Sequence, residues 1–275
     1  MMRHLDGIAT LVPEYDGFIV DLWGVIHDGN TLYGGARDAL ERLRRSGKPF
    51  VLLSNAPRRA GAAQVGLRAL GVADDMYTAV MTSGEATWAA LAHHGGARVY
   101  HLGPDRDRNV LEGRDVTVVA RPEDATLLLN TGPDDRYDPT SIEPYLPEIA
   151  ACLAAGLPMI CANPDLEVIR AGGVRVVCAG ALAVWYEERG GKVRWIGKPY
   201  PEIYATTLGL LGVPAGRTLA IGDALRTDIA GAQAAGIDSC WVLGGIHALD
   251  APEQAEAEAD AVALRPVATI PRFRW

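Results

Sequence analysis

The chain has 275 residues, of which 49% are hydrophobic and 22% charged. This composition excludes a disordered protein, because it supplies enough apolar material to bury a core. The 34 Asp and Glu residues outnumber the 26 Lys and Arg residues, and the net charge is -8, which argues against a nucleic acid polymer or an anionic membrane surface as the main partner.

The opening segment, MMRHLDGIATLVPEYDG, places Asp6, Pro13 and Glu14 where a secretory signal needs an unbroken apolar run. No stretch of the sequence reaches the roughly 18 apolar residues that a membrane span requires. We therefore expect a cytoplasmic protein. The cysteines lie far apart without a C-x-x-C pair, so we expect buried reduced thiols at Cys152, Cys161, Cys178 and Cys240.

Apolar runs alternate with helical patterns along the chain, which is typical of a parallel sheet joined by crossover helices. In the two outer parts of the chain we expect the strands 17–23, 49–55, 217–223 and 238–245 and the helices 35–46, 58–70 and 227–236. The Ala- and Glu-rich segment 251–263 favours a solvated helix or loop.

The middle of the chain has enough short strands and helices to form a module of its own. Strand-like runs include ARVYHLG (97–103), ATLLLNTG (125–132) and LPMICANPD (157–165), with a helical pattern around 142–155. We expect a core domain built from residues 1–83 and 188–275, with an inserted domain at 84–187. Length alone also allows one large domain.

Polar residues follow several of the predicted strands, and ligands of parallel sheets bind outside the carboxyl ends of strands. Two carboxylates at adjacent strand ends repel each other unless a cation lies between them, and Mg²⁺ suits such an oxygen-rich site. A metal, a lysine and neutral donors around one carboxylate form a site for a phosphoryl group, which that carboxylate can itself attack. The candidates are Asp21, Ser54, Asn55, Lys198, Asp223 and Asp228.

Each of these residues has a simpler interpretation when taken alone. An Asp after a strand is often a helix N-cap or a turn former, and Ser54 with Asn55 can form a turn. Asp228 fits a cap of the following helix, or a partner of the metal site or of Lys198. Their conjunction in this order, each after an apolar strand, favours the phosphoryl site.

The segments DLWGV (21–25), LLSN (52–55), GKP (197–199) and IGDALRTDIAGA (221–232) resemble the four ordered motifs of the haloacid dehalogenase-like (HAD) superfamily. CANPD (161–165) and GKPYPEIY (197–204) resemble its class IIA, the NagD-like sugar or nucleotide phosphatases. The resemblance implies an α/β fold with a doubly wound, Rossmann-like parallel sheet and an inserted smaller α/β cap domain of type 2. It also implies Mg²⁺-dependent hydrolysis of a small phosphorylated metabolite through an aspartyl-phosphate.

The resemblance also assigns roles to the candidate residues. It makes Asp21 the nucleophile and a Mg²⁺ ligand, and Lys198 the group that neutralises charge shared with the phosphate. Ser54 would bind the phosphoryl oxygens, with Asn55 beside it. Asp223 would be the second carboxylate ligand.

Further roles are implied for supporting and cap residues. Asp228 would support the metal site. Asn163, Pro164 and Asp165 would lie on the cap face where the substrate is chosen, although a plain Asx-Pro turn explains this trio equally well.

Trp23 departs from the family pattern, in which the residue two positions after the nucleophile is usually an acid/base aspartate. That position also gives the metal its backbone carbonyl, which Trp23 can still supply. An indole N–H has no useful acidity or basicity, and losing acid/base assistance typically removes about 10²–10⁴ in rate. His27 or Asp28 could substitute, but a flap hairpin with polar turn residues explains both.

Three interpretations follow from Trp23. The protein is a phosphatase that borrows an acid, prefers good leaving groups or is slow. Alternatively, it is a phosphotransferase with a long-lived aspartyl-phosphate, or a non-catalytic phosphate-binding regulatory protein. The sequence leaves open which sugar phosphate or nucleotide is the substrate, and whether the tail IPRFRW (270–275) docks on the core or forms a homodimer contact.

Overall fold

The computed structural model describes residues 2–170, 173–244 and 252–275. The chain forms two compact units. The first unit comprises Met1–Ser54, Gln64–Met81 and Lys198–Trp275, and the second comprises Asn55–Ala63 and Thr82–Gly197. The expected domain boundaries at 84 and 187 stay a prediction, and Gly245 and Ala251, which fell in predicted segments, lie outside the described residues.

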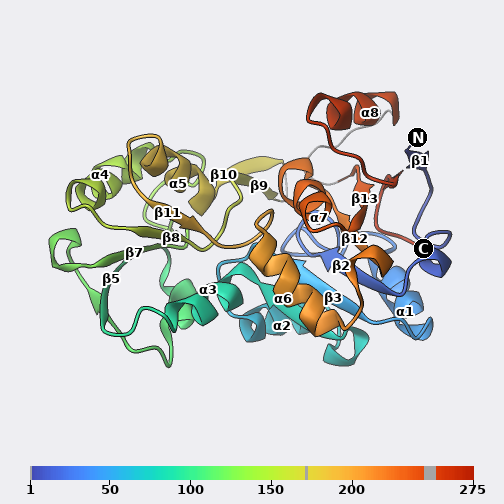
Figure 1. The fold of residues 1–275 in the computed structure, drawn as a ribbon, viewed down its shortest axis with the longest axis horizontal. Coiled ribbons are helices and arrows are strands. Elements are labelled where there is room, and N and C mark those ends of the chain that lie inside the picture. The colour runs from blue at the N-terminus through green and yellow to red at the C-terminus, as the bar shows by residue number, and fades with distance from the viewer. Residues whose placement is uncertain (1, 171–172, 245–251) are drawn as a thin grey trace. The chain divides into compact units, whose positions relative to one another are not determined.

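A seven-stranded sheet forms the centre of the first unit (Figure 1). The strands β2, β3 and β12 are buried along their whole length, as in a parallel sheet covered on both faces, and for this reason their sequences are continuous apolar runs. In spatial order the strands are β1 (Arg3–His4), β14 (Ala268–Ile270), β13 (Asp238–Val242), β12 (Thr218–Gly222), β2 (Gly17–Asp21), β3 (Phe50–Ser54) and β4 (Ala79–Thr82).

The first unit also contains amphipathic helices, which bury one apolar face. In α1 the buried Ala39, Leu40 and Leu43 lie on one face, while the i,i+4 ion pair between Asp38 and Arg42 lies on the exposed face. The helical segments of this unit are η1 (Val12–Glu14), α1 (Ala36–Arg45), α2 (Ala60–Ala69, which begins in the second unit), η2 (Asp74–Met76), α6 (Pro201–Leu211), η6 (Ala215–Arg217), the π-helix η7 (Leu225–Ile229), α7 (Ala230–Ala234) and α8 (Pro252–Ala261).

The second unit contains a five-stranded parallel sheet and a separate antiparallel hairpin. In spatial order the sheet consists of β11 (Val193–Trp195), β8 (Met159–Cys161), β7 (Leu127–Asn130), β5 (Ala97–Leu102) and β6 (Val116–Val119). The hairpin is β9 (Glu167–Arg170) with β10 (Val174–Val177), and the helical segments are α3 (Ser83–Leu91), η3 (Asp105–Leu111), η4 (Pro122–Asp124), η5 (Glu143–Tyr145), α4 (Leu146–Ala154) and α5 (Ala179–Glu187).

Alternating side chains of this second sheet supply two hydrophobic clusters. Leu127 and Leu129 of β7 pack with residues of α3 and η3, whereas Leu128 packs with residues of α4 and α5. Because successive side chains of a strand point to opposite faces, α3 and η3 cover one face of the sheet and α4 and α5 cover the other.

The fold class expected from the sequence is confirmed, since the chain is α/β with a parallel sheet at its core. The expected helix 227–236 begins as a π-helix. The segment after residue 251 is a helix, but it is not wholly solvated as expected. Ala255 and Ala259 of α8 are buried against Trp241, because small side chains let the helix approach the sheet closely.

The C-terminal tail packs onto its own unit, as the simpler interpretation of IPRFRW predicted. Phe273 is buried, and the carbonyl oxygen of Arg274 accepts a hydrogen bond of 2.8 Å from the N–H of Ile8. The guanidinium of Arg42 lies 5.9 Å from the ring centre of Trp275. The tail therefore packs against the segment after β1 and against α1.

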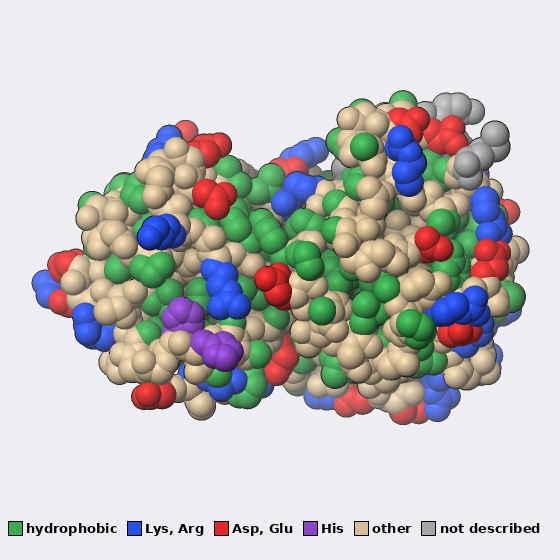
Figure 2. Space-filling model, viewed as in Figure 1, with side chains coloured by type: hydrophobic (Ala, Val, Ile, Leu, Met, Phe, Trp, Pro, Cys, Tyr) green, Lys and Arg blue, Asp and Glu red, His purple; other side chains and the backbone are tan. Residues whose placement is uncertain are grey.

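The surface and the helix lengths fit the composition. On the face shown in Figure 2, acidic and basic side chains of the described residues are interspersed rather than gathered by sign. Among the described helices, none is both long and apolar enough to cross a membrane. All four cysteines are buried, as expected.

Candidate active site

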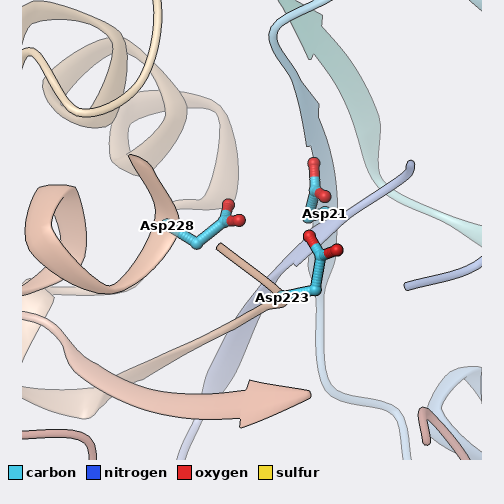
Figure 3. Close-up of side chains that lie close together, drawn as sticks. All are labelled: Asp21, Asp223 and Asp228. Atoms are coloured by element: carbon cyan, nitrogen blue, oxygen red, sulfur yellow. The ribbon is translucent and has the colours of Figure 1, made fainter. Parts of the chain in front are cut away.

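Two aspartates lie at the carboxyl ends of neighbouring strands in the first unit. Asp21 ends β2, and Asp223 follows β12, which pairs with β2 in parallel. Both side chains are buried, with exposed fractions of 6% and 4%. Figure 3 shows their carboxyl groups close together with that of Asp228. Parallel pairing alone therefore brings these two carboxylates to one edge of the sheet.

The turn after β12 positions the third carboxylate. Asp228 lies in the π-helix η7, and its Oδ2 accepts a 3.1 Å hydrogen bond from the N–H of Ala224. A Cβ at Gly222 would lie 2.2 Å from the Cβ of Asp228, so only glycine ends β12 without displacing this aspartate. The wider π turn thus folds Asp228 back over the strand end.

Lys198 connects the carboxylates from a distant part of the chain. Its Nζ lies 2.5 Å from Oδ1 of Asp21 and 2.7 Å from Oδ1 of Asp228. Only 3% of Lys198 is exposed, and a buried ammonium is tolerated only with such partners. The lysine follows β11, precedes α6, and joins Pro199 through a cis peptide bond.

The charges of the cluster favour the binding of a cation. Burial raises the pKa of the Asp21 carboxyl well above its usual range; Lys198 opposes this rise, while Asp228 and Asp223 add to it. Among the described residues, three buried carboxylates lie close together, and the ammonium of Lys198 contacts two of them, so the carboxylates outnumber this ammonium. A bound divalent cation would offset that excess, and oxygen donors of this kind suit Mg²⁺.

The donor set also fits a metal geometrically. One carboxylate oxygen from each of Asp21, Asp223 and Asp228 lies within 4.8 Å of the others. Both oxygens of Asp228 already accept hydrogen bonds, from Lys198 and from the N–H of Ala224. Asp21 and Asp223 are therefore the better candidate ligands, and Asp228 is the better candidate for holding Lys198.

The chain after Asp21 turns sharply next to this cluster. Gly24 has φ +82°, and a Cβ there would lie 2.1 Å from Oδ2 of Asp223. Its N–H donates to the carbonyl of His27 at 3.0 Å. Because Gly24 has no side chain, the Asp223 carboxylate can lie directly against this turn.

Trp23 belongs to this turn, and its indole packs against His27 and Gly29. Its ring meets that of His27 edge to face, with centroids 5.9 Å apart, and a Cβ at Gly29 would lie 2.6 Å from the indole. Nδ1 of His27 accepts the N–H of Gly29, and Oδ1 of Asp28 accepts the N–H groups of Asn30 and Thr31. His27 and Asp28 therefore stabilise the turn, as the flap interpretation predicted.

The remaining candidates divide between the units. Ser54 ends β3, next to β2, and is buried in the first unit. Asn55 belongs to the second unit, where its Nδ2 donates to Oδ1 of Asp165 at 2.9 Å. Oδ1 of Asn163 accepts the N–H of Asp165 at 3.0 Å, which is an Asx turn. Asn55 and the CANPD segment are thus linked to each other.

Two residues that the sequence did not single out support the cluster. The hydroxyl of the buried Tyr204 donates to the carbonyls of Thr227 and Asp228 at 3.2 and 3.1 Å, and the indole of Trp241 donates to the carbonyl of Asp223 at 2.9 Å. Trp241 lies on the predicted strand 238–245, whereas Tyr204 lies on α6 (Pro201–Leu211), which was not predicted as a helix. Neither residue carries a local signal other than that of a core residue.

The segments that match known protein families contain the motifs described above. Residues 18–117 match the haloacid dehalogenase-like hydrolase family, and residues 195–265 match a HAD-hydrolase-like family. A crystal structure of a haloacid dehalogenase-like hydrolase from Brucella suis 1330 is 33% identical, covers 98% of this chain and 99% of its own, and superimposes with a TM-score of 0.87. The chain belongs to the haloacid dehalogenase-like hydrolase family.

Two curated relatives match over most of their length. Ribonucleotide monophosphatase NagD of Escherichia coli K12 is 28% identical over 90% of this chain and 92% of its own. Sugar-phosphatase AraL of Bacillus subtilis 168 is 27% identical over 83% of each chain. The NagD-like resemblance of the motifs thus agrees with relatives named as nucleotide and sugar phosphatases.

Proposed function

We propose that this HAD-like hydrolase is a Mg²⁺-dependent phosphatase that acts on a small phosphorylated metabolite, a sugar phosphate or a nucleotide, in the cytoplasm. The observation that carries the proposal is the contact of Lys198 with Asp21 inside a buried carboxylate cluster at the strand ends. The names of the relatives NagD and AraL support the reaction and the substrate class.

The residues of the cluster would have different roles in catalysis. Asp21 and Asp223 would hold Mg²⁺, together with the backbone carbonyl of Trp23. When bound, Mg²⁺ supplies positive charge against the phosphoryl oxygens. Lys198 would contribute a second positive charge, and Asp228 would hold its ammonium toward Asp21. Ser54 and Asn55 would donate hydrogen bonds to the phosphoryl group.

Asp21 would act as the nucleophile. Its carboxylate oxygen forms a bond to phosphorus while the bond from phosphorus to the ester oxygen breaks, so the alcohol leaves and an aspartyl-phosphate remains. Water then attacks phosphorus, which frees inorganic phosphate and restores the Asp21 carboxylate. The leaving oxygen and the attacking water both need proton transfer, which the indole of Trp23 cannot provide.

Trp23 favours a second candidate function, a phosphotransferase or a phosphate-binding regulatory protein on the same scaffold. The turn engages Nδ1 of His27 and Oδ1 of Asp28, which would weigh against either side chain as a replacement for the missing acid/base. A phosphoenzyme that resists water would then persist long enough to pass its phosphoryl group to another acceptor.

The remaining assignments belong to the same proposal. Residues 84–187 would form an inserted cap domain, residues 1–83 and 188–275 would form the core domain, and Asn163 and Asp165 would contact the part of the substrate beyond its phosphate. Their side-chain and backbone contacts within the second unit would hold this segment in a fixed shape.

The deciding experiment measures phosphate release from p-nitrophenyl phosphate with Mg²⁺. Asp21→Asn should reduce the rate at least about 10³-fold, because it removes the nucleophile. The matched control is Asp16→Asn, since Asp16 precedes β2 and forms an exposed ion pair with Arg217; it should retain the wild-type rate. Equal activity of Asp21→Asn and wild type would rule out the proposed mechanism.

A second measurement separates the two candidate functions. Acid-quenched protein from a reaction with ³²P-labelled substrate should carry label on Asp21 if the phosphoenzyme persists. Rapid phosphate release without trapped label favours the phosphatase. Label without release favours the phosphotransferase.

A further inference from the structure

The strand order of the second unit creates a crevice at one position of its sheet. The sheet strands follow one another along the chain as β5, β6, β7, β8 and β11, but β6 pairs on one side of β5 and β7 on the other. The chain leaves β5 toward η3 and leaves β7 toward α4, which cover opposite faces. Ligands of open α/β sheets bind at such a switch point, outside the carboxyl ends of the strands.

A cavity of about 600 Å³ occurs at this position. Its lining comes from the segments that follow β5 and β7, from the end of β6 and from α4, all within the second unit. The volume lies in the range of small-molecule sites. The cavity involves none of the candidate active-site residues.

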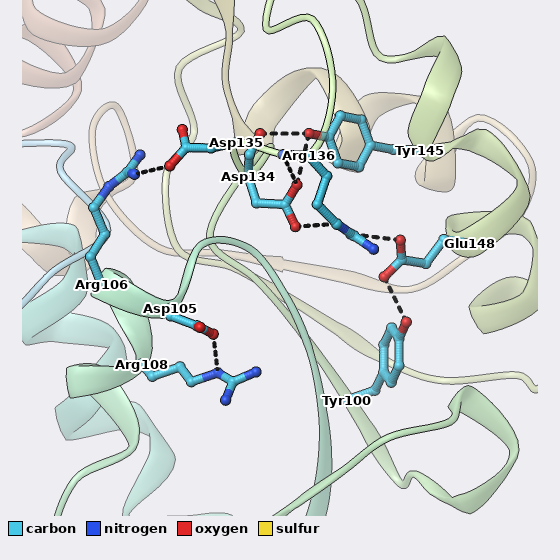
Figure 4. A network of polar contacts seen from close by, with 9 residues as sticks. All are labelled: Tyr100, Asp105, Arg106, Arg108, Asp134, Asp135, Arg136, Tyr145 and Glu148. Atoms are coloured by element: carbon cyan, nitrogen blue, oxygen red, sulfur yellow. Dashed lines mark hydrogen bonds and ion pairs between the residues drawn. The ribbon is translucent and has the colours of Figure 1, made fainter.

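Charged side chains of both signs line the cavity and form ion pairs (Figure 4). Toward solvent, Arg106 pairs with Asp135 at 2.9 Å and Arg108 with Asp105 at 3.1 Å, and the two arginines are 46% and 54% exposed. Exposed pairs of this kind contribute little to stability. Both guanidinium groups can therefore exchange their carboxylate partner for an anionic group of a ligand at low cost.

A less exposed part of the lining presents hydrogen-bond acceptors. Glu148 accepts from the hydroxyl of Tyr100 at 2.6 Å and from Arg136 at 2.9 Å, and Asp134 accepts from the hydroxyl of Tyr145 at 3.1 Å. The side chains of Asp134 and Glu148 are only 14% and 20% exposed. Carboxylates held in this way suit the hydroxyl groups of a sugar, as an acidic residue does for ribose in dinucleotide sites.

The third part of the lining is apolar and includes one unused polar atom. Pro104, Val118 and Val119 face the cavity, and Val118 is 44% exposed. The ring of His101 also lines the cavity; its Nε2 bonds with Thr131, whereas its buried Nδ1 has no hydrogen-bond partner among the described residues. A flat, partly apolar ring with polar edges is the chemistry that fits this wall.

We propose that the crevice between the loops after β5 and β7 binds a nucleoside monophosphate as a site separate from the Asp21 cluster. The phosphate contacts Arg106 and Arg108, the ribose hydroxyl groups donate to Asp134 and Glu148, and the base lies against Pro104 and Val118. The lining carries all three kinds of surface side by side, whereas inorganic phosphate would use only the arginines. The site does not require that Asp21 be a nucleophile.

Calorimetric titration with adenosine 5′-monophosphate tests the site in the full chain. The protein carries Asp21→Asn, so that the probe is not consumed, and the buffer contains EDTA to weaken binding at the Asp21 cluster. Substituting Arg106→Ala together with Arg108→Ala should weaken binding about tenfold or more, because two charge-assisted contacts are lost. Arg121→Ala removes an ion-paired arginine of the same unit that is 63% exposed and is not part of the lining, and it should leave the affinity unchanged.

Two further probes test the base and the phosphate separately. Adenosine and ribose 5-phosphate should each bind at least about tenfold more weakly than the complete nucleotide. Equal affinity of the double arginine variant and its parent, or no binding of the nucleotide at millimolar concentration, would overturn the proposal. If ribose 5-phosphate bound as tightly as the nucleotide, the apolar part of the lining would not contact a base. That result would overturn the proposal as well.

Discussion

Lys198 donates to Asp228 over 2.7 Å, and both side chains are more than nine-tenths buried. Oδ2 of the same aspartate accepts the N–H of Ala224, so Asp228 is fixed at both oxygens. The lysine therefore reaches Asp21 in one orientation. Under the proposed mechanism, this contact places the charge of Lys198 without itself touching the substrate.

Asp228→Asn should lower turnover by positioning alone. The amide keeps an oxygen for the N–H of Ala224 but withdraws the charge that holds Lys198, so we expect kcat to fall about 10–10²-fold with little change in KM. Steady-state kinetics with p-nitrophenyl phosphate measure this split. Asp75→Asn, at an exposed ion pair with Arg44, is the control. A change confined to KM would contradict a positioning role.

Gly24→Ala should damage the active site beyond its cost in backbone strain. A Cβ at Gly24 would meet the Asp223 carboxylate at 2.1 Å, whereas a Cβ at Gly47, with a similar φ of +74°, meets nothing within 4 Å. Both alanine variants should lose about 1–2 kcal/mol in the free energy of unfolding. Only Gly24→Ala should also bind Mg²⁺ more weakly, which calorimetry detects; equal Mg²⁺ affinities would refute the proposed place of Asp223.

Trp23→Asp should accelerate hydrolysis of esters that have poor leaving groups. A carboxyl group at this position can protonate the leaving oxygen, so we expect kcat on an alkyl phosphate to rise about 10²-fold. The rise on p-nitrophenyl phosphate should be smaller, since nitrophenolate leaves without a proton. Trp23→Asn controls for relief of the packing against Gly29 and His27. Equal acceleration by both variants would assign the effect to packing.

Asp107 should make folding stability fall as pH rises. Burial raises the pKa of its carboxyl from 3.8 to about 6, because the guanidinium of Arg58, with Nε at 3.8 Å, compensates only in part. The folded state thus binds the proton more tightly than the unfolded chain. The stabilising contribution is fully present below pH 3.8 and is lost as pH rises through about 6.

The test compares Asp107→Asn with wild type in urea unfolding. The variant should be more stable at pH 7.5, by up to about 2 kcal/mol, and the difference should vanish near pH 4. Asp105→Asn, an exposed aspartate of the same helix, should show no such trend. A difference between Asp107→Asn and wild type that stays constant with pH would refute the assignment.

Local sequence patterns predicted four strands of the seven-stranded sheet in the first unit, but not β1, β4, β14 or the helix α6. The strands β2, β3, β12 and β13 fall inside the segments predicted from apolar runs, because a strand buried on both faces must be apolar throughout. The helix α8 was less predictable. Its Ala- and Glu-rich sequence suggests solvation, and only packing against Trp241 shows that the alanine face is buried.

By itself the sequence determined that Asp21 and Asp223 follow parallel strands, since strand signals act over a few residues and parallel strands share one carboxyl edge. Tertiary structure decided what joins them. Lys198 lies 177 positions from Asp21, and no local pattern encodes a contact that depends on how distant segments pack. The same holds for Asn55, which adjoins Ser54 in sequence but donates a hydrogen bond to Asp165, 110 positions away. The packing of distant segments determines which partners buried polar groups have.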